Sequence, residues 1–426
     1  LAVQNGAEWR ATGGFIGNWG ILTSEGGKVR LDHFERISSL NPRPGESRVL
    51  HAPEEYVRRY ERFLPGQAWQ NVNMSPDFPT MAQIMTDQYR QATGEQVDGI
   101  LAVDPEGLAA LLRLTGPVSV AGWPEPLSAQ NAVRVTLNDA YIAFPGGERV
   151  DFLGDVAHAV MDRVTSERLG KPAKIARVLG RSAREGHLIL AFTRPEEQQL
   201  ALKLHVAGKV PAASSDSLLL TTQNANGTKL DYYLRRNLTY AVHLDPTAGD
   251  GVARLTGRVD VGLDNSAPDT GLPSYVIGVD NTLGHAGENR SFLSLYSPLR
   301  MTAATFEGNQ QPLESMTELG RNVYAEFFSV PAQSRRTLTV SLAGTVTLGR
   351  RGAYTLDLVR QPGIAPDDVT VTIDVPPGWR VVDGQGVKAA GGRRATAHLQ
   401  LDETTRLRVR VVPAASNIWQ RLLEGD

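Results

Sequence analysis

The segment from Gln4 to Gly20, QNGAEWRATGGFIGNWG, places several reactive side chains directly before a glycine pair. A glycine pair allows the backbone to approach a ligand closely, and a neighbouring arginine can bind a phosphate or carboxylate through two hydrogen bonds. The alternative is a strand end whose polar side chains satisfy buried backbone groups, with Glu8 paired to Arg10. The candidate residues are Glu8 and Arg10 for catalysis and Gln4, Asn5 and Thr12 for substrate binding.

Two further clusters carry acidic, amide and basic side chains. In NVNMSPDFP, Asn73 and Asp77 precede a predicted helix, where Asp77 would cap the helix and the helix N-terminus offers an anion site. In LDHFERISSL, Asp32 and Arg36 share one face of a strand and form either a structural ion pair or part of a site. We treat Asp32, Arg36 and Asp77 as catalytic candidates and Asn73 as substrate-binding.

Several classes of function are excluded or disfavoured by composition. The chain contains no cysteine, which excludes disulfides, cysteine–zinc sites, iron–sulfur clusters and thiol nucleophiles. Its net charge is −2 with lysine and arginine scattered along the chain, so a nucleic-acid partner is not expected. Neither a phosphate-binding glycine loop nor a zinc-protease or hydrolase motif occurs. The metal is left open, and Mg²⁺ is the ion that the candidate carboxylates would hold.

The 426 residues predict two or three domains, the first an α/β layer domain over residues 1–225. A Gly-rich turn, EGGK, joins two alternating segments into a hairpin that would return Arg36 beside Arg10, so both arginines should open into one pocket with Asn73 and Asp77. The predicted elements are the hairpin Gly14–Leu22 and Val29–Ile37; helices Pro79–Thr93, Pro105–Leu114, Ser128–Tyr141, Val150–Glu167, Ala173–Arg184 and Pro195–Val206; and strands Val97–Val103, Val118–Val120, His187–Phe192 and Ser217–Thr222.

The pattern changes after residue 225, where short alternating runs between turns predict antiparallel β-structure. We expect a β-sandwich-like domain over residues 226–345, then a smaller β region over 346–426 with a short helix at Asn417–Leu423, and we expect this half to act as scaffold. The predicted strands are Leu238–Leu244, Ala253–Leu263, Tyr275–Val279, Phe292–Tyr296, Thr337–Ala343, Tyr354–Val359, Val369–Val375 and Leu407–Val412.

Five separate strings resemble domain-of-unknown-function family 4012, whose members are actinobacterial envelope proteins with an N-terminal membrane helix. They are QNGAEWRATGGFIG, NMSPDFP, VDGILAVDPEGLAALLRLTGPV, NANGTKLDYYLRRNLTYAV and NSAPDTGLPSYV. Because the chain starts at Leu1 without a methionine, we read it as a fragment. The resemblance implies an extracytoplasmic protein of the cell envelope, anchored by a transmembrane helix upstream of this fragment.

A more distant resemblance is to the LytR–CpsA–Psr family of cell-wall glycopolymer ligases, through GKVRLDHFERI, the long segment from NVNMSPDFP to LTGPVSV, and LSAQNAVRVTLNDAY. That family implies an α/β/α domain that binds a polyprenyl pyrophosphate-linked glycan and passes the glycan phosphate to peptidoglycan. Arg36 stands where the family has a motif arginine and Asn73 where it has a motif asparagine. Ile37 replaces a motif aspartate, and Leu137 and Asp139 replace two pyrophosphate-binding arginines.

Three functions remain open at this point. The first is a glycopolymer transferase acting on a polyprenyl-phosphate-linked or cell-wall glycan, with Arg10 and Arg36 on phosphate oxygens and Glu8, Asp32 or Asp77 as base or Mg²⁺ ligand. The second is a non-catalytic envelope module that binds glycan, lipid or a partner protein. The third is a glycoside hydrolase that uses a pair of these carboxylates.

Overall fold

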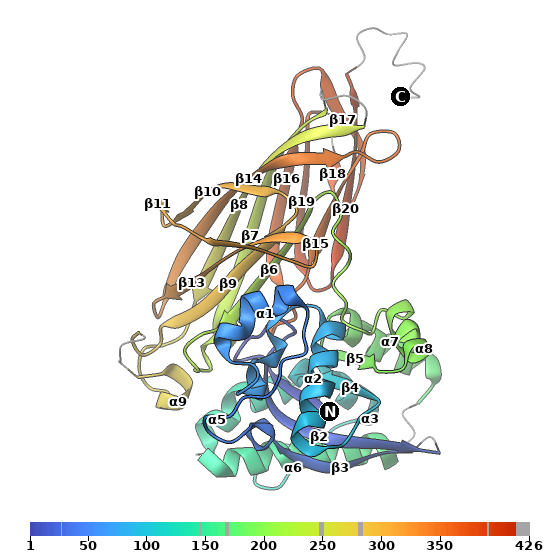
Figure 1. The fold of residues 1–426 in the computed structure, drawn as a ribbon, viewed down its shortest axis with the longest axis vertical. Coiled ribbons are helices and arrows are strands. Elements are labelled where there is room, and N and C mark those ends of the chain that lie inside the picture. Colours follow the sequence, from blue (N-terminus) through green and yellow to red (C-terminus); the bar gives the residue numbers. More distant parts are fainter. Residues whose placement is uncertain are drawn as a thin grey trace.

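The computed structural model describes residues 1–26, 28–144, 146–166, 170–246, 251–279, 284–389 and 392–414. It is a mixed α/β structure with three sheets, of five, eight and seven strands. The helices gather with the five-stranded sheet at one end of the molecule, and the two larger sheets extend away from them (Figure 1).

The five-stranded sheet holds the N-terminal segment in its middle. Its order is β3 (Lys28–Arg36), β2 (Phe15–Glu25), β1 (Ala2–Asn5), β4 (Gly99–Val103) and β5 (Leu188–Phe192). β1 runs parallel to β4, and the other neighbours are antiparallel. The predicted hairpin and both later strands are therefore confirmed, whereas β1 was not predicted.

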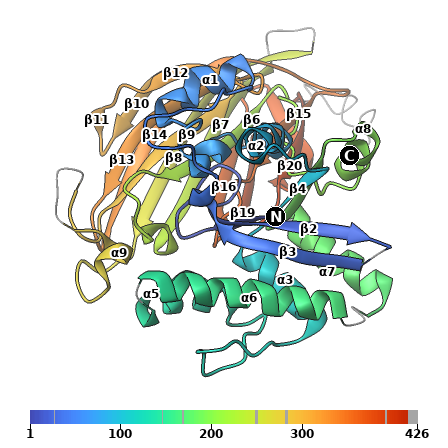
Figure 2. The same ribbon diagram turned by 60° about the horizontal axis from the view of Figure 1, so that its bottom comes forward.

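Helices lie on both faces of this sheet. α2 (Phe78–Thr93) packs its apolar side on one face, together with Ala2, Ile16 and Ile189. It begins where Asp77 accepts a hydrogen bond from Thr80 N and ends at Gly94, whose φ of 79° places it in the left-handed region. α6 (Gly146–Ser166) runs along the other face beneath β2 and β3 (Figure 2).

Three further predicted helices are confirmed: α3 (Pro105–Thr115), α7 (Pro172–Arg184) and α8 (Pro195–Lys203). α1 (Glu54–Tyr60) was not predicted, and neither were the 3-10 turns at Ile37–Leu40, Glu61–Phe63, Trp69–Met74 and Leu230–Tyr232. The predicted helix Ser128–Tyr141 is present from Ala132 as one unbroken helical run, made of α4 (Ala132–Arg134), a π-helical segment (Val135–Asp139) and α5 (Ala140–Ala143). The predicted strand Val118–Val120 is reduced to an isolated bridge from Val118 to Leu127.

The two larger sheets share one hydrophobic core. The eight-stranded sheet has the order β11 (Asn309–Gln310), β10 (Arg300–Phe306), β14 (Ser334–Thr347), β8 (Val252–Asn265), β7 (Leu234–Asp245), β16 (Asp367–Asp374), β19 (Arg394–Leu401), β18 (Lys388–Ala389). The seven-stranded sheet has the order β12 (Glu314–Glu318), β13 (Arg321–Val330), β9 (Asn289–Ser297), β6 (Ser217–Asn224), β15 (Ala353–Val359), β20 (Thr405–Pro413), β17 (Trp379–Gln385). Tyr240 and Val259 from the first sheet and Leu295 and Tyr354 from the second belong to the same buried cluster.

The C-terminal half differs from the predictions in three respects. β6, expected to end the N-terminal region, pairs with β9 and, in parallel, with β15. β7 and β16 are also parallel, so the sheets are mixed rather than purely antiparallel. Strands from the expected regions 226–345 and 346–426 share both larger sheets: they are direct neighbours in the eight-stranded sheet, at β7 and β16, and are separated by β6 in the seven-stranded sheet.

One predicted strand is a helix. Tyr275–Val279 was expected to be extended, but Ser274–Ile277 forms the short helix α9, because Pro273 precedes it and Gly278 ends it with a φ of 78°. The predicted helix Asn417–Leu423 lies outside the described residues.

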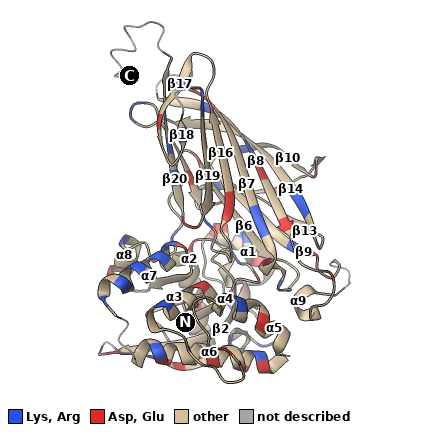
Figure 3. Ribbon diagram, turned by 180° about the vertical axis from the view of Figure 1, so that it is seen from behind, with Lys and Arg blue, Asp and Glu red and all other residues tan. Residues whose placement is uncertain are grey.

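Within the described ranges, no helix has the length and apolar character needed to span a bilayer. Basic and acidic residues are interspersed along the chain in both parts of the molecule (Figure 3).

Candidate functional site

An apolar cavity of about 500 Å³ lies between the five-stranded sheet and the helix α6, which covers one face of that sheet. Alternate residues of the strands line it, including Val3 on β1, Leu101 on β4 and Leu190 on β5, and all three are only half-buried. Their neighbours Ala102 and Ile189 point to the opposite face and are fully packed against α2. One face of the sheet is thus filled by protein, whereas the other leaves apolar side chains facing an open volume.

α6 forms the long wall of this cavity. Leu153, Ala157, Met161 and Val164 line it at helical spacing, and Val150 extends the row towards the start of the helix. Fourteen residues separate Val150 from Val164, which corresponds to about 21 Å along the helix. The volume and apolar lining are those of a small-molecule or lipid-chain site.

The cavity is polar at one end only. Asn5 ends β1 and pairs with Phe15, while Arg36 ends β3 and pairs with Asn18, so these side chains lie at the same edge of the sheet. Towards the β2–β3 turn the lining is apolar, as at Leu22. The cavity is therefore an apolar slot with hydrogen-bonding side chains at one end. The polar and aromatic side chains lining that end include Asn5, Asn18, Arg36, Ser38, Gln70, Tyr141, Arg149, Lys229 and Tyr275. The carboxylate of Asp104, which follows β4 and is paired with His187, lines the cavity as well.

A buried ion pair stands at this polar end. Lys229 Nζ lies 2.6 Å from Glu8 Oε2, and the two residues are only 2% and 5% exposed. Burial lowers the pKa of Lys229, but Glu8 and the nearby tyrosines raise it by more, so that the pKa ends above its ordinary value. The ammonium group also lies 5.1 Å from the ring centre of Tyr275 and 5.2 Å from that of Tyr141. Lys229 is therefore a charged group at the wall of an apolar cavity.

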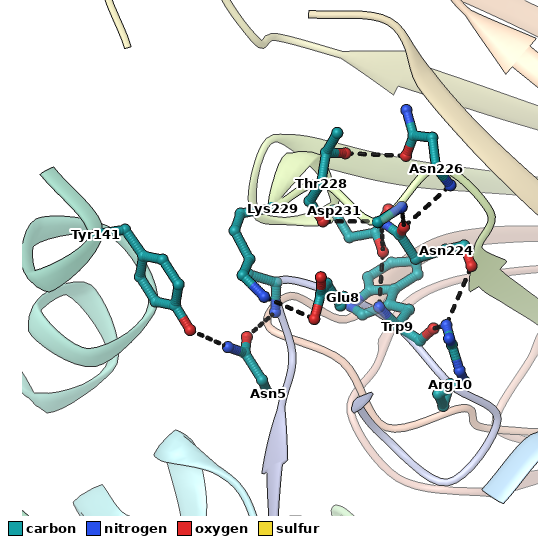
Figure 4. A network of polar contacts seen from close by, with 12 residues as sticks. Asn5, Glu8, Trp9, Arg10, Tyr141, Asn224, Asn226, Thr228, Lys229 and Asp231 are labelled. Carbon is teal, nitrogen blue, oxygen red and sulfur yellow. Dashed lines mark hydrogen bonds and ion pairs between the residues drawn. The ribbon is translucent and has the colours of Figure 1, made fainter. Parts of the chain in front are cut away.

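Arg10 lies in a network that joins the two parts of the molecule (Figure 4). Its guanidinium donates to Trp9 O at 3.0 Å, to Asn224 O at 3.1 Å and to Asn71 Oδ1 at 3.2 Å. Burial lowers the pKa of Arg10, while the carboxylates of Glu8 and Asp231 act in the opposite direction. Arg10 does not line the cavity.

The predicted convergence of Arg10 and Arg36 is therefore wrong. Arg36 lines the cavity and is exposed, whereas Arg10 sits in the loop between β1 and β2 and binds backbone carbonyls. The hairpin does return Arg36 to the correct end of the sheet, but the chain leaves β1 at Asn5 and turns towards the C-terminal half before Arg10.

The predicted amide and hydroxyl residues mostly organise that same loop. Gln4 Nε2 and Asn73 Nδ2 each donate to Thr12 Oγ1 at 2.9 Å, and Asn73 Nδ2 also donates to Gly14 O at 2.8 Å. Gln4, Thr12 and Asn73 are buried. Asn5 donates to the hydroxyl of Tyr141 and, with Gln4, lines the cavity. Asn5 is thus the predicted binding residue best placed to meet a ligand.

The predicted carboxylates are not brought together. Asp77 accepts hydrogen bonds from Thr80 Oγ1 at 2.7 Å and from Val210 N at 3.0 Å, so it caps α2 and anchors the segment after α8. Asp32 lies on the exposed hairpin with Arg30 Nε at 3.3 Å. None of the three predicted carboxylates lines the cavity. Across the described ranges, no group of three or more metal-binding side chains is found.

The residues of the polar end that were not predicted include Tyr141, Arg149, Lys229 and Tyr275. Three of them were present in the sequence strings used above, with Lys229 in NANGTKLD, Tyr275 in NSAPDTGLPSYV and Tyr141 in LSAQNAVRVTLNDAY. No local pattern assigns them a role, because they reach the cavity from segments far apart in the chain.

Residues 1–141 match the model of DUF4012, a family described as "Protein of unknown function". The resemblance to DUF4012 is thus confirmed over residues 1–141, which include the loop of Glu8 and Arg10, Arg36 and the cavity-lining residues of β1 to β4, but not α6. No curated protein matches the chain.

Solved structures match the chain only in part. They include a proposed nutrient binding protein from Legionella pneumophila (9% identity, TM-score 0.28, 46% of this chain and 72% of that one) and an M1 zinc metallopeptidase from Deinococcus radiodurans (15%, 0.24, 42% and 42%). Yeast LTA4 hydrolase in complex with bestatin is a third (11%, 0.25, 44% and 30%). The chain spans less than half the length of both of these hydrolases.

Proposed function

We propose that this protein binds a polyprenyl-phosphate-linked glycan, with the polyprenyl chain in the cavity and the phosphate at its polar end. The observation that carries the proposal is the shape of the site, an apolar slot beside α6 that ends among Asn5, Arg36, Arg149 and Lys229. Apolar walls favour a long hydrocarbon chain, and arginine and lysine favour the phosphate that follows it.

Under this proposal the protein acts in the cell envelope as a glycopolymer transferase of the LytR–CpsA–Psr type. Two features support it: Arg36, at the motif position of that family, lines the cavity, and helices lie on both faces of the five-stranded sheet. We further propose an α/β/α arrangement like that of the family, followed by a β-sandwich formed by the two larger sheets, since these share one core. An extracytoplasmic, membrane-anchored location is part of the same proposal.

A second candidate is a non-catalytic envelope module that holds the lipid-linked glycan or another lipid. It is favoured because Glu8, Asp32 and Asp77 are held away from the cavity by partners of their own. Leu137 and Asp139 stand where the LytR–CpsA–Psr family has two pyrophosphate-binding arginines. Here Leu137 adds an apolar side chain to the cavity and Asp139 pairs with Arg134, so neither can bind a pyrophosphate as those arginines would. The glycoside hydrolase hypothesis gains no support, because its carboxylates do not face one another across a cleft.

Filling the cavity tests the binding proposal directly. Ala157 lines the cavity on α6, so Ala157→Phe should occupy the volume that the polyprenyl chain needs. Ala176→Phe makes the same change on the exposed side of α7 and serves as the control. By calorimetry with farnesyl phosphate, Ala157→Phe should bind at least about tenfold more weakly, equivalent to about 1.4 kcal/mol, while the control binds normally. Unchanged affinity in a folded Ala157→Phe protein would refute the proposal.

A transfer assay separates the two candidates. The protein is incubated with a polyprenyl-pyrophosphate-linked glycan and peptidoglycan, and glycan attached to the wall polymer is measured. Transfer that is lost in Ala157→Phe supports the transferase. Tight binding without transfer supports the module.

A further inference from the structure

Arg149 is a cation at the polar end without a carboxylate partner among the described residues. Its Cζ atom lies 4.6 Å from the ring centre of Tyr141 and 4.5 Å from that of Tyr275. The two rings are nearly parallel, with an interplanar angle of 4° and 6.1 Å between their centres. Arg149 is half-buried and lines the cavity, so its charge faces a less polar surrounding than an exposed arginine would.

Lys229 adds a second cation on the same wall. Lys229 lines the cavity, but its partner Glu8 does not, which places the carboxylate behind the ammonium group as seen from the cavity. An ammonium group has three N–H donors, and in the described chain the only carboxylate paired with this one is Glu8. Glu8 therefore keeps Lys229 charged and oriented while leaving donors for a ligand. Arg149, Lys229 and Glu8 together contribute one net positive charge, beside Arg36 and the His187-paired Asp104 that line the same cavity.

Tyr275 lies where the polar end of the cavity, beside Arg149 and Lys229, opens to solvent. It is 50% exposed and yet lines the cavity, so its ring lies between solvent and the interior. Tyr275 belongs to α9 and Lys229 precedes β7, so both come from the C-terminal half. Figure 4 shows Lys229 and Tyr141 reaching from different segments towards Asn5 and Glu8.

We propose that the phosphate group of the bound amphiphile is recognised at the corner formed by Arg149 and Lys229, beneath Tyr141 and Tyr275, rather than by Arg36. This inference rests on the proposed function, because it requires an amphiphile in the cavity. The guanidinium and ammonium groups donate charge-assisted hydrogen bonds to the phosphate oxygens. Arg36 is solvent-exposed, so water and salt screen its charge more strongly. Glu8 acts as a positioning residue.

A pair of ligands that differ only in the headgroup isolates this corner. Dodecyl phosphate carries the anion, and 1-dodecanol has the same chain without it. Arg149→Gln should weaken dodecyl phosphate binding by at least about tenfold and leave dodecanol binding unchanged within error. Arg36→Gln is the matched control, since it removes another arginine that lines the same cavity, and it should cost much less.

A second variant guards against misfolding. Lys229→Met alone would leave Glu8 buried without a partner, so it is combined with Glu8→Gln, which removes both charges at once. The double variant should also lose affinity for dodecyl phosphate while retaining dodecanol.

The outcomes separate this inference from the proposed function. Equal wild-type affinity for both ligands, or a larger loss from Arg36→Gln than from Arg149→Gln, overturns the assignment of the corner and leaves the lipid cavity standing. If the wild-type protein binds neither ligand, the proposed function fails and this inference fails with it.

Discussion

Asp216 predicts a pH dependence of stability that can be worked out from its surroundings. It is 0% exposed between the two larger sheets, where its Oδ2 atom accepts hydrogen bonds from Tyr240, at 3.0 Å, and from Tyr354. Burial raises the pKa of Asp216 from its ordinary 3.8 to about 7, although both tyrosines lower it. In the unfolded chain the carboxyl would ionise near its ordinary pKa.

The sign and size of the effect follow from proton linkage. Because the folded pKa is the higher one, the fold is most favoured below about pH 4 and loses stability as the pH rises towards 7. A difference of about three pKa units corresponds to roughly 4 kcal/mol at about 1.4 kcal/mol each. With an unfolding entropy of about 2.1 cal/mol/K per residue over the whole chain, this would shift Tm by about 4–5 °C.

Asp216→Asn should therefore stabilise the protein at pH 8 and have almost no effect at pH 4, because the amide resembles the protonated acid in shape. Tm would be measured by calorimetry between pH 4 and pH 8. Asp32→Asn makes the same chemical change on the exposed hairpin and should alter Tm little at either pH. If Asp216→Asn has the same Tm as wild type at pH 8, or a lower one, the buried Asp216 carboxylate does not destabilise the fold and the prediction is refuted.

Two further predictions concern the contact between α1 and β12 and the loop between β1 and β2. Glu318→Gln should lower the free energy of unfolding by about 3–5 kcal/mol in urea titrations, since it leaves Arg59 of α1, at 3.2 Å, as an uncompensated buried charge; a loss under about 1 kcal/mol would contradict this. Gly14→Ala should give unstable protein, because a Cβ there would lie 2.3 Å from Asn5 O, whereas Gly17→Ala should be tolerated because its Cβ meets nothing within 4 Å. Equal melting temperatures for the two alanine variants would refute the second prediction.

The elements predicted best are those with local start and stop signals. α2 has an aspartate cap, a proline in its first turn and a glycine at its end, and its apolar residues recur at helical spacing. The β2–β3 hairpin has a glycine turn between alternating segments. These signals are short-range, so one sequence suffices to read them.

The elements that were missed depend on distant partners. β1 is four residues long and becomes the central strand only because β2 and β4 flank it. The parallel pair β6–β15 joins Leu218 to Leu358, a contact that no local pattern announces. At α9 the β-branched and aromatic residues Tyr275, Val276 and Ile277 suggested a strand, but the flanking proline and glycine decide the backbone.

The site was predicted in part for the same reason. Arg36 was found because the hairpin register returns it to the polar end of the cavity. Asn5 was named only as one of the polar residues before the glycine pair, since the strand β1 that carries it was not predicted. The glycine pair was correctly seen as a close approach, but the partner is Asn5 O rather than a ligand. Conversely, Asp77 caps α2, as the capping alternative had allowed, whereas Asn73 donates to Gly14 O, a role that was not predicted.

The border expected near residue 225 therefore does not separate the site from the scaffold. Lys229 is paired with Glu8 and lines the cavity, and Tyr275 stacks on Tyr141 at its opening. A fragment ending at residue 225 would keep the apolar slot but leave Glu8 buried without its cation, which is a costly arrangement. The C-terminal half thus supplies part of the polar end, and any ligand with a charged headgroup would be bound by both halves of the molecule together.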